Sequence, residues 1–185
     1  MMTHLKTYYQ QAKPIDQYIE DMSVNKEGFL SIYEGFEMPQ NDSRFDAIQA
    51  KGYRYVLIIT EDWCGDAMMN SPILKHISEK LNLEVRAFYR DENTDLIDQY
   101  LTNGKSRSIP IFIFMNEQFE QLAVWGPRAQ SVQKFVTSVR EALPDKSHPD
   151  FSDKEKEVHQ TIRNRYLTDH TFWNDVYESI LKTLQ

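Results

Sequence analysis

The feature that most constrains the fold is a short apolar run, Val56-Leu57-Ile58-Ile59, which stands between polar segments. A run of this length without alternation is typical of a strand buried on both faces of a sheet. We therefore expect a strand over residues 53–60 in an α/β fold. The chain continues with Glu61-Asp62-Trp63-Cys64-Gly65. Apolar spacing then predicts a helix over residues 66–81, interrupted by Pro72.

Further strands and helices follow in alternation. The pattern predicts strands over 83–90, 109–115 and 119–125, and helices over 93–101 and 129–143. A short turn separates the last two strands, which indicates an antiparallel hairpin. Two strand–helix units followed by a hairpin and a helix predict a mixed sheet with helices on both faces.

Helical patterns also precede and follow this region. Residues 13–36 read as mainly helical, with Pro14 at a first helical position. Residues 144–149 form a linker before two amphipathic stretches over 153–166 and 171–184, which predict helices. The expected organisation is an N-terminal helical extension (1–42), a central domain (43–143) and a C-terminal helical extension (144–185).

The charge balance excludes several classes of partner. The formal net charge is -7 and the pI is about 5.2. A nucleic-acid binder or a protein docked on an anionic membrane needs a basic face, so neither is expected. The sequence has no apolar run near the roughly 20 residues of a membrane span and no secretory signal pattern, which favours the cytoplasm. The histidines show no metal spacing, and neither a metal nor an organic cofactor is implied.

A single cysteine, Cys64, excludes an internal disulfide. It lies where the buried strand gives way to a helix, and a helix N-terminus stabilises a thiolate. Trp63 could shield the sulfur, and Gly65 would let a partner backbone approach. Nearby acids, among them Asp66 in the first helical turn, oppose thiolate formation. The sequence leaves the sign of the resulting pKa shift open.

Two motifs resemble the thioredoxin family. Trp63-Cys64-Gly65 matches the start of the family's Trp-Cys-Gly-Pro-Cys motif, and Ile109-Pro110 matches its cis-proline loop. The resemblance spans residues 43–143 and implies a thioredoxin-like α/β fold, a central mixed sheet flanked by helices, with extra N- and C-terminal helices. The family's second cysteine is Ala67 here, and its buried acid is Ile58. Ordinary dithiol catalysis is therefore excluded.

The leading functional hypothesis is a monothiol protein in which Cys64 attacks a disulfide. Trp63, Gly65 and Asp66 would shape the site, Asp66 could also move a proton, and Ile109-Pro110 would hold an extended chain. The partner would be a disulfide-containing protein or a low-molecular-weight thiol that releases the mixed disulfide. Two alternatives remain open, namely a non-catalytic interaction module and a thiol peroxidase-like sensor. The terminal extensions are rich in aromatic residues, namely Tyr8, Tyr9, Tyr18, Phe172, Trp173 and Tyr177. The simplest expectation is that they pack against the domain, and the alternative is a homodimer contact.

Overall fold

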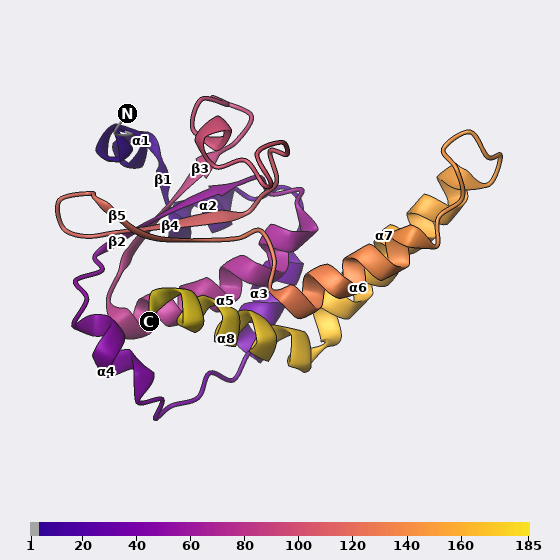
Figure 1. Cartoon of the computed structure of the whole chain (residues 1–185). Coiled ribbons are helices and arrows are strands. Elements are labelled where there is room, and N and C mark those ends of the chain that lie inside the picture. The colour runs from indigo at the N-terminus through magenta and orange to yellow at the C-terminus, as the bar shows by residue number, and fades with distance from the viewer. Residues whose placement is uncertain (1–3) are drawn as a thin grey trace.

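The computed structural model describes residues 4–185 (Figure 1). The helices are α1 (Leu5–Gln11), α2 (Ile15–Asp21), α3 (Lys26–Gly35), α4 (Arg44–Gln49), α5 (Gly65–Leu81), the 3-10 helix η1 (Ile97–Gln99), α6 (Gln130–Glu141), α7 (Phe151–Thr168) and α8 (His170–Leu184). The strands are β1 (Lys13–Pro14), β2 (Tyr55–Thr60), β3 (Glu84–Tyr89), β4 (Ile111–Met115) and β5 (Gln121–Trp125).

The strands form one mixed sheet in the order β1-β3-β2-β4-β5. The central strand β2 runs parallel to β3 and antiparallel to β4, and β4 pairs antiparallel with β5. This is the α/β arrangement expected from the order of the elements. The edge strand β1 was not expected, and it joins the N-terminal segment to the sheet by pairing with β3.

The pairing of β2 with β4 explains how distant motifs meet. Ile59, near the end of β2, pairs with Ile111, at the start of β4. Because the two strands are antiparallel, the segment that follows β2 and the segment that precedes β4 lie at the same edge of the sheet. Cys64 and Pro110 are therefore brought together by sheet register.

The two faces of the sheet are covered differently. Val56 and Ile58 of β2 belong to a large core that includes residues of α5, α6, α7 and α8. Leu57 and Ile59 point to the other face, where α1 and the segment around η1 supply the cover. One face thus carries long helices and the other carries short ones (Figure 1).

The helix expected over residues 93–101 is largely absent. The segment contains only η1, after which Thr102 bridges Ser106 and Asn103 adopts a positive φ. So short a segment gains little from helix propagation. Burial of Leu96 and Ile97 against the sheet is satisfied by a single turn.

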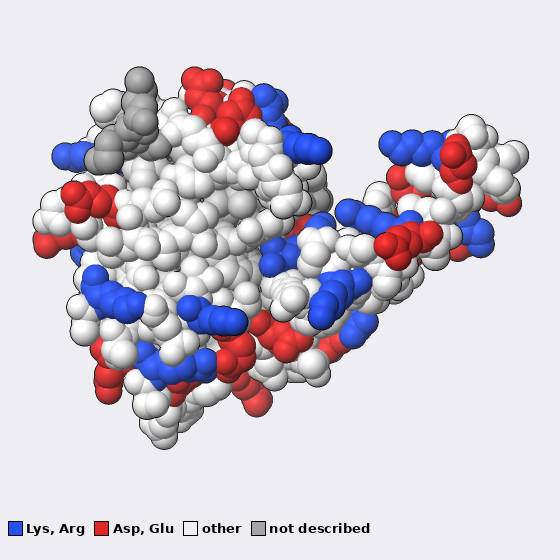
Figure 2. Space-filling model, viewed as in Figure 1, with Lys and Arg blue, Asp and Glu red and all other residues white. Residues whose placement is uncertain are grey.

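The C-terminal helices include an arm. Helices α6 and α7 lie side by side and project from the body, with their connecting loop at the far end (Figure 1). Figure 2 shows acidic and basic side chains mixed along this arm and a broad uncharged area on the body. Helix α8 returns to the body, where Phe172, Trp173 and Tyr177 are buried. No helix within residues 4–185 combines the length and the apolar character needed to cross a membrane.

Candidate functional site

Cys64 caps the N-terminus of α5. It has extended backbone geometry and its Sγ accepts a hydrogen bond from the backbone N–H of Ala67 at 3.4 Å. This is the position that a Ser or Asp side chain takes in an ordinary N-cap. The strand–helix junction read from the sequence therefore places the thiol on the first turn of α5.

The thiol also contacts the loop before β4. Its Sγ donates a hydrogen bond to the carbonyl oxygen of Ile109 at 3.6 Å, and the Ile109–Pro110 peptide bond is cis. A thiolate at this position would lose the bond and face the same oxygen. The contact therefore favours the protonated sulfur.

The pKa of Cys64 is raised to about 11, first by burial and then by the negative charge of Asp66. Hydrogen bonds from backbone N–H groups and the charge of Arg128 act in the opposite direction. Cys64 is only 8% exposed. The loss of hydration, which raises the pKa, therefore outweighs the stabilisation of the thiolate by the helix N-terminus. The direction of the pKa shift, which the sequence left open, is therefore upward.

Asp66 is held by an ion pair and a tyrosine. Arg128 Nε and Nη2 donate to its two carboxylate oxygens at 2.9 and 2.8 Å, and the Tyr166 hydroxyl donates to Oδ1 at 2.6 Å. Burial and the charge of Asp66 raise the pKa of Tyr166. These contacts tie the start of α5 to the loop before α6 and to α7. Proton transfer by Asp66 stays a prediction.

Trp63 and residues 23–25 of the N-terminal segment form a lip beside the thiol. The carboxylate of Asp62 accepts hydrogen bonds from the backbone N–H groups of Ser23 and Val24 at 2.9 and 3.3 Å. The side chain of Trp63 is 51% exposed, with the Arg90 guanidinium 5.1 Å from its ring. Trp63 therefore presents an apolar surface beside Cys64, and the Asp62 contacts position that lip.

Two glycines near the thiol, Gly65 and Gly126, differ in the space around them. Beyond its chain neighbours and the backbone of its own helix, a Cβ built on Gly65 would meet no heavy atom of residues 4–185 within 4 Å, so the surface is open there, as a close partner approach requires. Gly126 is the opposite case, because its φ is +132° and a Cβ would lie 2.3 Å from the carbonyl oxygen of Pro110. The Gly126–Pro127 peptide bond is also cis. Gly126 is thus required where the loop after β5 crosses the cis-proline loop.

A pocket of about 420 Å³ opens at the base of the arm and includes Cys64 in its wall. The lining comes from the lip, the N-terminus of α5, and facing sides of α6 and α7. Its residues are Val24, Asn25, Trp63, Cys64, Gly65, Asp66, Arg128, Val136, Arg140, His159, Ile162, Arg163 and Tyr166. Of the predicted site residues, Trp63, Cys64, Gly65 and Asp66 therefore share one pocket. Ile109 and Pro110 are not part of this lining, and Ile109 contacts the thiol through its backbone carbonyl.

Sequence reasoning missed the part of the site that α6 and α7 contribute. Arg140 is on α6, while His159 and Arg163 are one turn apart on α7 and share a helix face. The usable signal was this i, i+4 pair in an amphipathic helix. The sequence could not show which surface of the body that face would meet.

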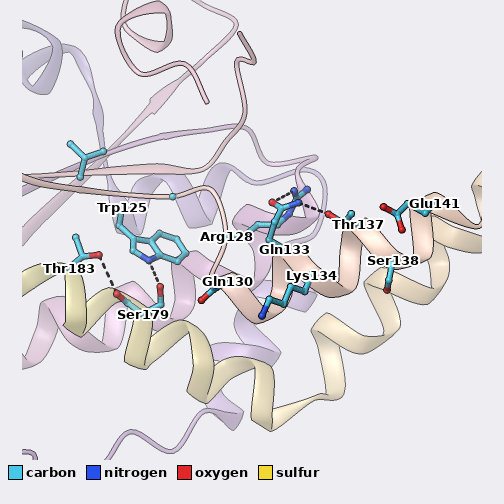
Figure 3. Close-up of a pocket in the computed structure, with 12 residues that line it drawn as sticks. Trp125, Arg128, Gln130, Gln133, Lys134, Thr137, Ser138, Glu141, Ser179 and Thr183 are labelled. Carbon is cyan, nitrogen blue, oxygen red and sulfur yellow. Dashed lines mark hydrogen bonds between the residues drawn. The ribbon is translucent and has the colours of Figure 1, made fainter. Parts of the chain in front are cut away.

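A second hollow, of about 740 Å³, lies on the other side of α6 (Figure 3). Strand β5, α6 and α8 line it, and the Trp125 indole N–H donates to Ser179 Oγ at 2.8 Å. The Arg128 guanidinium, which also donates to Gln133 Oε1 at 3.0 Å, borders both hollows. The groove in Figure 3 has no cysteine in its lining, so the pocket beside Cys64 is the candidate site.

The positions that depart from the family motif are apolar and buried. Ala67 is 2% exposed and Ile58 is 1% exposed. No second sulfur or buried acid therefore occupies either position. Within residues 4–185, no three His, Cys, Asp or Glu side chains gather as a metal site would require.

Comparisons with known proteins agree with this fold. A family model described as Thioredoxin matches residues 12–140, which begins further toward the N-terminus than the motifs indicated. No curated protein matches in sequence. The crystal structure of an HIV epitope-scaffold is similar, with a TM-score of 0.64 and 14% identity, and the match covers 97% of this chain and 96% of that one. A protein of unknown function from Pseudomonas aeruginosa gives a TM-score of 0.62 at 14% identity, over 97% of this chain and 98% of the other. Both similarities concern the fold, and their coverage includes the terminal helices.

Proposed function

Because this chain belongs to the thioredoxin family, we propose that Cys64 carries out thiol–disulfide exchange as a single thiol. The observation that carries the proposal is the placement of Cys64. It caps α5, contacts the carbonyl of Ile109 in the cis-proline loop at 3.6 Å, and lines an open pocket beside the exposed Trp63. A cysteine that serves only to pack the core would not line a pocket of this kind.

The reaction has two balanced steps. The Cys64 thiol loses its proton, its sulfur bonds to one sulfur of the substrate disulfide, and the substrate S–S bond breaks. The leaving thiolate takes up a proton, so Cys64 is left in a mixed disulfide. An outside thiol then attacks that bond, which forms a new disulfide with the former substrate half and returns Cys64 as a thiol. In the cytoplasm, which the sequence favours, low-molecular-weight thiols are the natural second reactant.

The raised pKa of Cys64 slows both steps of the reaction. With a pKa of about 11, roughly one sulfur in ten thousand is ionised at neutral pH. A more basic thiolate is more nucleophilic, which recovers about tenfold of the rate. The thiol and the mixed disulfide are both neutral states of Cys64. The site therefore stabilises both of them relative to the charged thiolate. We therefore expect slow formation and slow release of the adduct.

The same pKa supports a second candidate, a non-catalytic interaction module. Burial of the thiol and the apolar residues Ala67 and Ile58 are consistent with a site kept for binding. In this case a partner would use the pocket and the Trp63 lip without any bond to sulfur. The two functions differ in whether Cys64 reacts.

The test measures Cys64 alkylation against pH, and adduct formation with hydroxyethyl disulfide by mass spectrometry. We expect the alkylation rate to rise about tenfold per pH unit from neutrality and to level off near pH 11. A mixed disulfide should form and be reversed by added thiol. Cys64→Ser is the control, because serine is close to cysteine in size and the variant has no thiol. Failure of the wild-type protein to form any adduct, even at pH 10, would leave the interaction module as the function.

A further inference from the structure

The charge of the pocket beside Cys64 is opposite to that of the chain. The whole protein has a formal net charge of -7. The pocket lining contains three arginines, one histidine and a single carboxylate, that of Asp66. With the histidine neutral, the lining carries a net charge of +2. An acidic protein that gathers basic side chains beside its only thiol has a local preference for anions.

Most of this positive charge is not compensated by other residues. Arg128 is the exception, because it is paired with Asp66. Arg163 donates to the side-chain oxygen of Asn25 and to Met68 Sδ, both neutral acceptors. The side chains of Arg140 and His159 make no hydrogen bond or ion pair with any residue that the structure describes. Two guanidinium groups are therefore available to an anion.

The remaining lining defines the kind of ligand. Val24, Trp63, Val136 and Ile162 supply apolar walls, and a volume of about 420 Å³ fits a small molecule. A ligand that suits both parts has a short aliphatic stem and a carboxylate. The stem would lie against the apolar walls toward Cys64, and the carboxylate would reach the arginines.

We propose that this pocket selects low-molecular-weight disulfides and thiols that carry a carboxylate, through Arg140 and Arg163. The proposal rests on the thiol–disulfide exchange proposed above and names its substrate class. In the reaction, the ligand's S–S bond breaks as the bond to Cys64 Sγ forms, and the anionic leaving thiolate accepts the proton released by Cys64. The bound half stays in the pocket with its carboxylate on the arginines.

The test compares three small disulfides of similar length, which are dithiodipropionate (anionic), hydroxyethyl disulfide (neutral) and cystamine (cationic). Each rate with Cys64 is divided by the rate of the same disulfide with free mercaptoethanol, which removes intrinsic reactivity. We expect the anion to exceed the cation by about tenfold at low salt, and the ratio to fall as salt screens the charges.

The matched variants are Arg140→Gln and Lys134→Gln. Both remove one positive charge from α6, but Lys134 lines the groove of Figure 3 instead of the Cys64 pocket. Arg140→Gln should lower the anion-to-cation ratio about threefold, while Lys134→Gln should change this ratio less than 1.5-fold. The proposal would be overturned if the three disulfides had equal normalised rates with Cys64. It would also be overturned if the two variants changed the anion-to-cation ratio equally.

A binding measurement separates this proposal from the exchange reaction. Thiodipropionate has the same carboxylates but no disulfide, and it can be titrated into Cys64→Ser protein while the Trp63 indole signal is followed by NMR. Saturable binding that Arg140→Gln weakens supports the anion site even if Cys64 proves unreactive. Absence of binding at any concentration, with normal exchange in the wild type, would reject the anion site alone.

Discussion

The two hollows on either side of α6 share a helix and the side chain of Arg128, yet they differ in chemistry. The groove in Figure 3 is larger and is lined mainly by polar side chains, with Trp125 bonded to Ser179. The pocket at the base of the arm is smaller and contains the thiol, an ion pair and uncompensated arginines. Size alone therefore does not identify the site. The placement of a nucleophile and of unbalanced charge does.

The largest expected effect comes from Gly126→Ala, in the wall of the groove, where the loop after β5 crosses the cis-proline loop. The new Cβ would lie 2.3 Å from the backbone oxygen of Pro110 and 3.2 Å from Ile111 Cα, and backbone atoms cannot move aside as a flexible side chain can. We expect a loss of more than about 4 kcal/mol of unfolding free energy, measured by urea denaturation. Gly104→Ala is the matched control.

Gly104 has a positive φ of +69° but no neighbour within 4 Å of the new Cβ among the described residues. Its replacement should cost only about 1 kcal/mol, from backbone strain. Equal losses for the two variants would mean that the contact with Pro110 is unimportant and that conformation alone demands glycine.

A smaller effect, confined to the pocket, is expected from Asp66→Asn. Arg128 would lose its charged partner, whose side chain is 13% exposed, at a cost of about 3 kcal/mol. The negative charge that raises the pKa of Cys64 would also be removed. Alkylation of Cys64 at neutral pH should then become about tenfold faster, which corresponds to a pKa lower by about one.

The control for this charge change is Asp153→Asn, on the exposed start of α7. It should leave the alkylation rate within about twofold, because a charge on the exposed arm is screened by solvent. A slower reaction in Asp66→Asn would contradict the electrostatic account. It would instead indicate that the carboxylate takes part in proton transfer during exchange, the role suggested by the sequence.

The smallest effect is expected in the groove, from Ser179→Ala. The Trp125 indole N–H would lose its acceptor at 2.8 Å, at a cost of about 1 kcal/mol in unfolding free energy. The alkylation rate of Cys64 should not change, because the variant touches only the second hollow. A change in that rate would show that the two hollows are coupled through Arg128.

The sequence was sufficient for four strands of the sheet but not for the edge strand β1. The meeting of Cys64 with Pro110 was implied by the resemblance to the thioredoxin family. The four strands depend on local signals, among them the buried run at 56–59 and the hairpin that follows Pro110, and on the general rules for strand connection. The helix expected over 93–101 was wrong, since a few apolar residues at helical spacing also fit a single turn against the sheet. Short segments depend on tertiary packing more than on periodicity.

The basic side of the pocket was beyond sequence reasoning for a different reason. Arg140 and Arg163 belong to two helices joined by an exposed loop, and their meeting depends on how the arm packs on the body. Nothing in the spacing of α7 distinguishes an arginine that faces a pocket from one that faces solvent. Asp66 illustrates the same point, because its partners Arg128 and Tyr166 are 62 and 100 residues away in sequence.

Ala67 determines how long an adduct on Cys64 would last. A second cysteine there would displace the adduct within the chain, at a rate that the fold itself determines. Here residue 67 offers the sulfur only a hydrogen bond from its backbone N–H, and the chain contains no other cysteine. The half-life of the adduct is then inversely proportional to the concentration of outside thiol. The fraction of protein that carries an adduct would therefore depend on the recent concentration of thiol in its surroundings. The lifetime of the adduct would vary with the solution and not with a second group in the chain.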